Sequence, residues 1–253
     1  GCANSEPVMQ HRPMKLYHAL QSQGFGTRKV CVARVLAGEV AVNGEVCDDP
    51  EARVDPARLE LTLDGVAWAY REKAYVLMHK PAGYECSHHT SHHPSVFALL
   101  PPPLVQRGVQ CVGRLDQDST GLLLFSDDGQ FIHRMTSPKK GVAKVYRAVC
   151  AEPVSDAMLD ALRSGVQLND EPAPIAALAC ERLDERSLRL TLAEGKYHQV
   201  KRMVGATGNR VERLHREAIG LLALPADLPP GSWRWLETDD LKKLEQSWPS
   251  ATS

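Results

Sequence analysis

The segment from Gly113 to Gly129 carries the residues most suited to chemistry. Asp116 follows an arginine and a leucine, and a turn rich in small and polar residues separates it from the apolar run 122–125. Such a run is typical of a buried strand, and a residue at the edge of a strand has a rigid support. Because a rigidly held carboxylate beside a cation can act as a nucleophile, Asp116 is our candidate for that role.

The same turn fits two other chemistries. Asp116, Asp118 and Gly121, with Asp127 at the twelfth place, match the start of a calcium-binding loop, although that place normally carries a bidentate glutamate. The pattern Asp-x-Asp-x-Thr also resembles the nucleophile motif of haloacid-dehalogenase-like phosphatases, in which an apolar strand ends at the first Asp. Here Gly113 and an arginine interrupt that strand. For the carboxylates taken alone, a solvated acidic turn is the default interpretation.

A second group of candidates is basic. No acid occurs between Arg134 and Arg147, and Tyr146 stands among the cations of this stretch. The basic residues are Arg134, Lys139, Lys140, Lys144 and Arg147. An aromatic ring among cations can stack on a base while its neighbours hold phosphates. The alternative for Tyr146 is an ordinary aromatic side chain of a strand.

The third group lies in the segment 194–203. On a helix, the apolar side chains of this segment share one face, with Lys201 at the border of that face and Arg202 pointing away. The apolar positions are Tyr197, Val200, Met203 and Val204. A lysine at such a border usually extends its ammonium to water. The functional alternative is an ion pair with Asp116, which would keep that carboxylate ionised.

A cluster of metal-type side chains occurs in the segment 86–93. Its members are Cys86, His88, His89, His92 and His93. They lack a fixed ligand spacing and a second group elsewhere, so we interpret the segment as a polar loop and expect no metal. No glycine-rich phosphate loop and no dinucleotide fingerprint occur, and we expect no cofactor.

Composition limits the classes of protein. The 253 residues include 43% apolar ones, enough for a real core, and a net charge of -1 gives no bulk attraction to nucleic acid or to a membrane. The seven cysteines are scattered, which argues against a disulfide framework and favours a reducing, cytoplasmic location. All apolar runs are far shorter than the roughly 20 residues of a membrane-spanning helix.

The sequence divides into a tail, a small domain, a linker and a large domain. Residues 1–12 lack periodicity and are expected to be disordered, 13–62 form the small domain, 63–72 the linker and 73–248 the large domain. In the small domain we expect two short helices between Lys15 and Gly38, with Leu16 and Leu20 inward, Thr27 as N-cap of the second, and Val30, Ala33 and Leu36 at helical spacing. The Asn-Gly pair within 40–46 predicts a hairpin.

The large domain contains more strands than helices. We expect strands near 75–78, 109–113, 121–126, 143–151, 176–183, 187–193 and 209–215, and helices near 129–136, 155–165, 197–206 and 238–246. Several strands are adjacent in sequence, which favours an α+β domain with a mixed, largely antiparallel sheet over a regular βαβ winding.

Together these segments resemble the RsuA-type bacterial ribosomal RNA pseudouridine synthases. The resemblance covers nearly the whole chain and rests on Lys80-Pro81-Ala82-Gly83-Tyr84, Gly113-Arg114-Leu115-Asp116 with Thr120-Gly121-Leu122-Leu123 and Asp127-Asp128-Gly129, Lys144-Val145-Tyr146, and the run from Glu194 to Met203. It implies a small N-terminal RNA-binding domain like one in a ribosomal small-subunit protein. There Tyr17-His18 departs from the family's usual pair.

The resemblance implies a cofactor-free isomerisation of uridine to pseudouridine by base flipping. It makes Asp116 the nucleophile, Tyr146 the stacking residue and Lys201 the basic partner, with Arg202 as the adjacent alternative. Arg114 would hold or replace the flipped nucleotide. The remaining residues expected to contact RNA are Lys144, Arg202, Lys15, Arg28, Lys29 and Arg34.

The run Tyr197-His198-Gln199-Val200-Lys201-Arg202-Met203 looks more like that of the small-subunit enzymes than that of the large-subunit ones. We therefore expect 16S rRNA within a small-subunit assembly intermediate as the partner, no membrane, and a monomer. The alternatives are a 23S rRNA pseudouridine synthase and a non-catalytic RNA-binding or ribosome-assembly factor.

Overall fold

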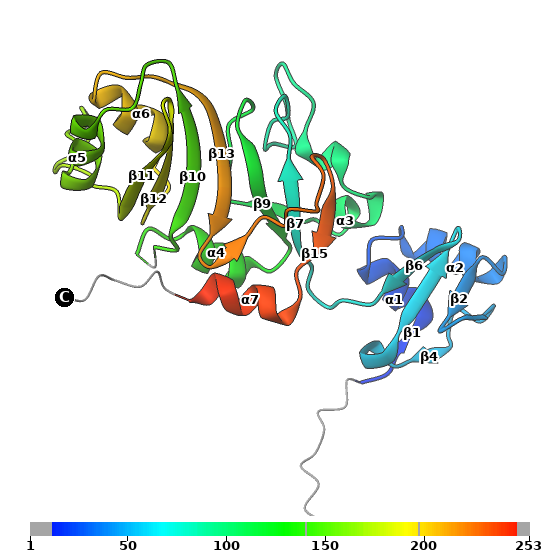
Figure 1. Ribbon diagram of the computed structural model, residues 1–253. Coiled ribbons are helices and arrows are strands. Elements are labelled where there is room, and N and C mark those ends of the chain that lie inside the picture. Colours follow the sequence, from blue (N-terminus) through cyan, green and yellow to red (C-terminus); the bar gives the residue numbers. More distant parts are fainter. Residues whose placement is uncertain (1–11, 140, 197, 247–253) are drawn as a thin grey trace, which may run out of the picture. The chain divides into compact units, whose positions relative to one another are not determined.

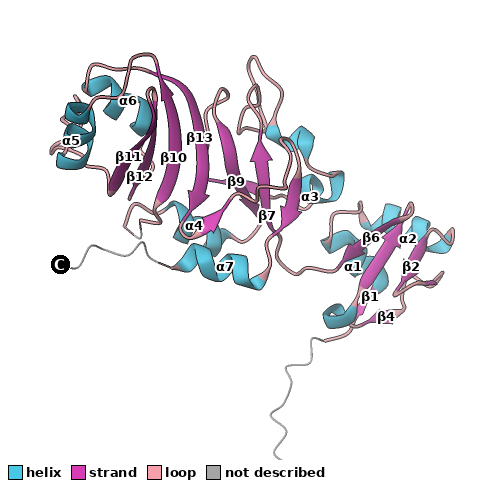
Figure 2. Cartoon of the chain, in the orientation of Figure 1, coloured by secondary structure: helices cyan, strands magenta, loops and turns pink. Residues whose placement is uncertain are grey.

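A computed structural model of the chain describes residues 12–139, 141–196 and 198–246. Its contacts form two compact units, residues 1–74 with 100–109 and residues 75–99 with 110–253. Figures 1 and 2 show their helices and strands. The expected tail, residues 1–12, lies outside the described residues except for Arg12. Across the described ranges, no helix combines the length and apolar character needed to cross a membrane.

Two helices of the smaller unit begin and end close to where the sequence predicts. They are α1 (Leu16–Ser22) and α2 (Arg28–Leu36). Leu16 and Leu20 are fully buried, and the Thr27 hydroxyl caps α2 by accepting a hydrogen bond from the Val30 N–H. The apolar spacing in α2 was misleading, however. Val30 and Leu36 are exposed, whereas Cys31 and Val35 are the residues that this helix buries.

A four-stranded sheet, in the order β3-β2-β5-β6, completes the smaller unit. Its strands are β2 (Val40–Val42), β3 (Glu45–Val46), β5 (Glu60–Leu63) and β6 (Val66–Ala69), while β1 (Met14–Lys15) pairs with β4 (Arg53–Val54) and a 3-10 turn spans Pro56–Arg58. The predicted hairpin is present, with Asn43 and Gly44 at positive φ. The predicted linker 63–72 is wrong, because it contains β6, whose Trp68 is buried and pairs with Leu61.

Residues 100–109, including α3 (Pro102–Gln106), also belong to the smaller unit. The buried Gln23 accepts hydrogen bonds from Trp68 Nε1 and Arg107 Nη1, both at 3.2 Å. Gly24 has φ +91°, and a Cβ on it would lie 2.0 Å from the Pro103 carbonyl oxygen. This close approach requires glycine. Residues 100–109 therefore pack tightly against the turn that follows α1.

The larger unit is built on one sheet whose main strands run in the order β11-β12-β10-β13-β9-β7-β15, with β14 beside β13 and β8 beside β9. The strands are β7 (Tyr75–Lys80), β8 (Gln110–Val112), β9 (Thr120–Ser126), β10 (Lys144–Cys150), β11 (Ala179–Asp184), β12 (Ser187–Leu192), β13 (Val211–Ile219), β14 (Leu222–Ala223) and β15 (Trp233–Trp235). All pairs are antiparallel except β13 with β9. The predicted α+β class with a mixed, largely antiparallel sheet is confirmed.

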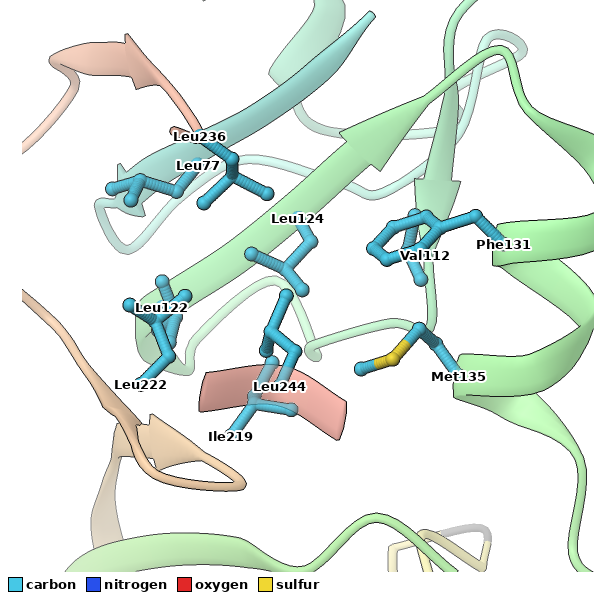
Figure 3. Close-up of a cluster of buried hydrophobic side chains, with 10 residues drawn as sticks. All are labelled: Leu77, Val112, Leu122, Leu124, Phe131, Met135, Ile219, Leu222, Leu236 and Leu244. Carbon is cyan, nitrogen blue, oxygen red and sulfur yellow. The ribbon is translucent and has the colours of Figure 1, made fainter. Parts of the chain in front are cut away.

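Helices of the larger unit pack against this sheet. They are α4 (Gly129–Thr136), α5 (Asp156–Ser164), α6 (Gln199–Ala206) and α7 (Thr238–Glu245), with a 3-10 turn at Val96–Leu99. A core forms where α4 and α7 meet β8, β9 and the end of β13, and Figure 3 shows its side chains converging. It consists of Leu77, Val112, Leu122, Leu124, Phe131, Met135, Ile219, Leu222, Leu236 and Leu244. Burying these side chains on one side of β9 holds the loop that precedes this strand.

Candidate active site

The loop between β8 and β9 carries Asp116 and is fixed by a buried lysine. Lys80, at the end of β7, is fully buried and donates to the carbonyl oxygens of Pro81, Gln117 and Ser119 at 3.0, 3.2 and 2.7 Å. Burial lowers the pKa of its ammonium. Three backbone carbonyls satisfy the three donors of the ammonium. Lys80 therefore holds the loop in place and has no donor left for a ligand.

The Asp116 carboxylate contacts two side chains from the start of α6. Lys201 Nζ lies 3.1 Å from Oδ2, and His198 Nε2 lies 3.1 Å from Oδ1. Lys201 also contacts Asp118 Oδ1 at 3.2 Å. Burial by itself lowers the pKa of Lys201, but hydrogen bonds to Asp116 and Asp118 raise it above the ordinary value. The ammonium is therefore charged at neutral pH and places a positive charge beside the Asp116 carboxylate.

The backbone at His198 is unusual. Its φ is +46°, in the left-handed region that costs a non-glycine residue about 1–2 kcal/mol. This conformation occurs directly before α6 and aims the imidazole at Asp116. Sequence reasoning placed His198 in the motif but assigned it no contact. The available signal was its place in the same motif, three residues before Lys201.

Asp116 borders a cavity of about 170 Å³ in the larger unit. Tyr146 and Lys144 from β10 line it, as do Arg114 and Arg216. Tyr146 is buried, with 7% of its surface exposed, and Lys144 Nζ donates to the Val142 carbonyl oxygen at 3.0 Å. Burial, and then the charge of Arg216, lower the pKa of Lys144 to about 8. The cavity thus combines an aromatic ring, several cations and one carboxylate.

The other predicted site residues are not among those that line this cavity. Arg202 forms an ion pair with Asp170, so Lys201 and not Arg202 contacts Asp116. In the smaller unit, Lys15 pairs with Glu51, Arg34 pairs with Glu39 and Asp64, and the Arg28 guanidinium lies 4.9 Å from the ring centre of Tyr17. Lys29 is exposed on α2. Of the four residues of this unit that were predicted to contact RNA, Lys15 and Arg34 are therefore paired with carboxylates.

Residues 74–206, which include Asp116, Tyr146 and Lys201, match the sequence model of the family described as RNA pseudouridylate synthase. Two curated relatives, from Yersinia pestis and Escherichia coli strain K12, are 39% and 37% identical to the chain. Each alignment covers 88% of this chain, and 95% and 96% of the respective relative. The chain belongs to the RNA pseudouridylate synthase family. The resemblance seen in its motifs is confirmed.

A solved structure extends the match from sequence to fold. The crystal structure of a pseudouridylate synthase superimposes on this synthase with a TM-score of 0.64 and 33% sequence identity, covering 91% of this chain and 99% of that one. Both curated relatives carry the name ribosomal small subunit pseudouridine synthase A. The similarity therefore includes both units of the synthase and not the larger unit alone.

Two of the acidic residues that suggested calcium or phosphoryl chemistry, Asp116 and Asp118, contact Lys201 in this synthase. Asp128, which follows the third of them, Asp127, caps α4 and accepts a hydrogen bond from the Tyr75 hydroxyl at 2.6 Å. Burial and Asp128 raise the pKa of Tyr75 to about 12. His88, from the His-rich segment, stacks on Phe97. Among the described residues, no three metal-type side chains are close enough together to hold an ion.

Proposed function

We propose that this synthase converts a specific uridine of 16S rRNA to pseudouridine with Asp116 as the nucleophile. The observation that carries the proposal is the Asp116 carboxylate, which lies between Lys201 and His198 at the border of a cavity that also contains Tyr146. Family membership supplies the reaction. The names of the two curated relatives support the small ribosomal subunit as the source of the substrate.

The cavity is suited to a single flipped base. A volume of about 170 Å³ corresponds to roughly six water molecules at about 30 Å³ each, which is room for one planar pyrimidine. A uridine inside a helix hides its glycosidic bond, so it must leave its stack before the enzyme can act. We infer that the uracil stacks on Tyr146 and brings C1′ of the ribose near Asp116. Arg114, exposed at the cavity, would hold the nucleotide or take its place.

The reaction then needs no external reagent. The bond between uracil N1 and ribose C1′ breaks, and its electron pair stays with the base. The Asp116 carboxylate stabilises the electron-poor sugar, either by bonding to it or by charge. After the base turns, C5 bonds to C1′, the proton on C5 leaves and N1 gains a proton. The ion pair with Lys201 supports this role because it holds the carboxylate at the border of the cavity.

The RNA backbone around the flipped base requires further contacts. We propose that Lys144, which lines the cavity, approaches a phosphate, as do Arg202 in the larger unit and Lys15, Arg28, Lys29 and Arg34 in the smaller one. Such contacts position an enzyme on its RNA without reading the base. We also propose that the synthase acts on the RNA within a partly assembled small subunit. We propose that it does so as a monomer.

Release of tritium from C5-labelled uridine tests the proposal. The substrates are a 16S transcript and a 16S assembly intermediate, with a 23S transcript as the comparison. We expect release by the intact protein, in the presence of EDTA, and none by the Asp116→Asn variant. A protein that binds the 16S RNA but releases no more tritium than Asp116→Asn is a binding factor, and this result would overturn the enzymatic proposal. Release from the 23S transcript alone would overturn the choice of subunit.

A further inference from the structure

Arg216 is the largest fully buried polar side chain in the larger unit that the proposed chemistry does not yet use. It lies on β13 with 2% of its surface exposed. Nε donates to the Leu122 carbonyl oxygen at 2.8 Å, and Nη1 lies 3.4 Å from the Arg114 carbonyl oxygen. Nη2 is buried and has no hydrogen-bond partner in the described part of the chain. A buried donor without a partner costs about 1–3 kcal/mol, so its retention calls for a reason.

The backbone around Arg216 is closely packed. Arg216 stands opposite Tyr146 on β10 and opposite Gly121 on β9. A Cβ on Gly121 would lie 2.2 Å from the Arg216 carbonyl oxygen, which shows how closely the two strands approach. Because the Leu122 contact also anchors Nε, the guanidinium is held in place before any ligand arrives.

The guanidinium lines the same cavity as Asp116 and Tyr146. The nearby carboxylate is already engaged, since Asp116 contacts Lys201 and His198. Within the described ranges Arg216 forms no ion pair, and a buried guanidinium without a carboxylate stabilises negative charge that arrives later. The position therefore suits a ligand that is neutral when it binds and becomes negative during the reaction.

Resting on the proposed function, we propose that Arg216 is a catalytic residue that donates a hydrogen bond from Nη2 to a carbonyl oxygen of the flipped uracil. When the N1–C1′ bond breaks, the uracil keeps the electron pair, and the negative charge spreads from N1 onto its carbonyl oxygens. A preorganised donor stabilises this anion more than the neutral base, and so accelerates the cleavage. Arg216 only donates a hydrogen bond, and no other reagent is consumed.

Two substrates that differ in leaving-group quality test this role. One RNA carries uridine and the other 5-fluorouridine at the target position, and fluorine makes the departing base a more stable anion. Loss of the target nucleoside is followed under single-turnover conditions by digestion and mass spectrometry, because the fluorinated base has no C5 proton to release. The variants are Arg216→Gln and Arg216→Lys, with Arg234→Gln on β15 as the matched control.

We expect Arg216→Gln to slow the reaction of uridine by about 10²–10³-fold, the usual effect of losing one such donor, while RNA affinity changes less than about threefold. The loss with 5-fluorouridine should be at least about tenfold smaller, because a stable anion needs less help. Arg216→Lys should fall between these values, and Arg234→Gln should match the wild type.

Equal losses on the two substrates would mean that Arg216 only supports the fold, and a rate within about threefold of the wild type would mean that it has no role. Either result overturns the inference. If Arg216→Gln does not fold, the ratio of the two losses for Arg216→Lys decides. Failure of the proposed function is distinguishable, since the wild-type protein would then leave the uridine substrate unchanged.

Discussion

Lys201 contacts two carboxylates at once, Asp116 at 3.1 Å and Asp118 at 3.2 Å. Asp116 borders the cavity that also holds Tyr146, whereas the Asp118 side chain is more than half exposed. The ammonium therefore links the candidate nucleophile to a solvent-facing acid. The two contacts share one cation. Variants of Lys201, Asp116 and Asp118 therefore separate the role of the Lys201–Asp116 ion pair from that of the loop that carries both acids.

The first prediction concerns this shared cation. Lys201→Met should slow pseudouridine formation at least about 100-fold, because Asp116 loses the cation that contacts and orients its carboxylate. Asp118→Asn should cost less than about fivefold, since Lys201 keeps its bond to Asp116. Single-turnover rates on the 16S substrate measure both. Similar losses in the two variants would contradict the distinction between Asp116 and Asp118.

His198 combines a left-handed backbone with a contact to Asp116, and one substitution separates these features. Asparagine tolerates this backbone but is too short to span the 3.1 Å contact made by the imidazole. His198→Asn should therefore leave the thermal midpoint nearly unchanged while lowering the single-turnover rate. His198→Ala should lower both. Full activity of His198→Asn would show that only the backbone matters.

The lowered pKa of Lys144 predicts a pH dependence of RNA binding. Its pKa of about 8 lies below the ordinary value of 10.5, because burial disfavours the charged form. The ammonium is present below pH 8 and lost above it, so affinity for RNA should weaken as pH rises through 8. Lys144→Met should bind more weakly at pH 7 and lack this transition. Affinity measured from pH 7 to pH 9 at constant salt checks both statements.

The charge on Lys144, which should strengthen RNA binding, destabilises the folded protein. Below pH 8 the folded protein bears the full cost of a buried ammonium, and this cost declines between pH 8 and 10.5, where only the unfolded chain holds the proton. Lys144→Met should therefore raise the free energy of unfolding at pH 7, by an amount that shrinks as pH approaches 10.5. Denaturant unfolding at several pH values tests the sign.

Two glycines provide a matched pair of stability predictions. Gly121 has φ +114°, and a Cβ there would lie 2.2 Å from the Arg216 carbonyl oxygen, so Gly121→Ala should destabilise the protein by about 3 kcal/mol or more. Gly205, within α6, has no neighbouring atom within 4 Å of an added Cβ. Gly205→Ala should stabilise by about 0.5–1 kcal/mol, because alanine favours a helix. Denaturant unfolding of both variants provides the comparison.

The last prediction concerns phosphate contacts of the smaller unit. Lys15 and Arg34 are paired with carboxylates, whereas Lys29 is exposed and Arg28 lies over the Tyr17 ring. Lys29→Gln and Arg28→Gln should each reduce the slope of log affinity against log salt by about 1. Arg58→Gln, exposed on the 3-10 turn of the same unit, is the control. An unchanged slope in both variants would contradict the RNA-binding role.

Deletion of residues 1–62, the predicted tail and small domain, would not remove one whole unit. The smaller unit extends to residue 74 and includes residues 100–109, and β5 ends at Leu63. A deletion at 62 would cut through β5 and expose the partners of Gln23, which include Arg107. Effects on RNA affinity would then be inseparable from effects on folding.

Local signals in the sequence predicted local structure well. The Asn43-Gly44 turn produced its hairpin, Thr27 capped its helix, and the apolar run beginning at Leu122 formed a buried strand. Each of these features depends on residues within a few positions of one another, where backbone sterics and capping dominate. Spacing failed in α2, because Val30 and Leu36 were apolar but Cys31 and Val35 faced the rest of the unit.

By itself the sequence determined the class of fold, the family motifs and the choice of Asp116 as candidate nucleophile. Only the tertiary structure decided which basic residue meets that carboxylate, because Lys201 and Asp116 are 85 positions apart and both Lys201 and Arg202 follow the same motif. It also revealed His198 beside Asp116 and an unpartnered donor on Arg216. Such facts depend on how strands and helices distant in sequence pack, and burial and hydrogen-bond partners exist only after that packing is complete.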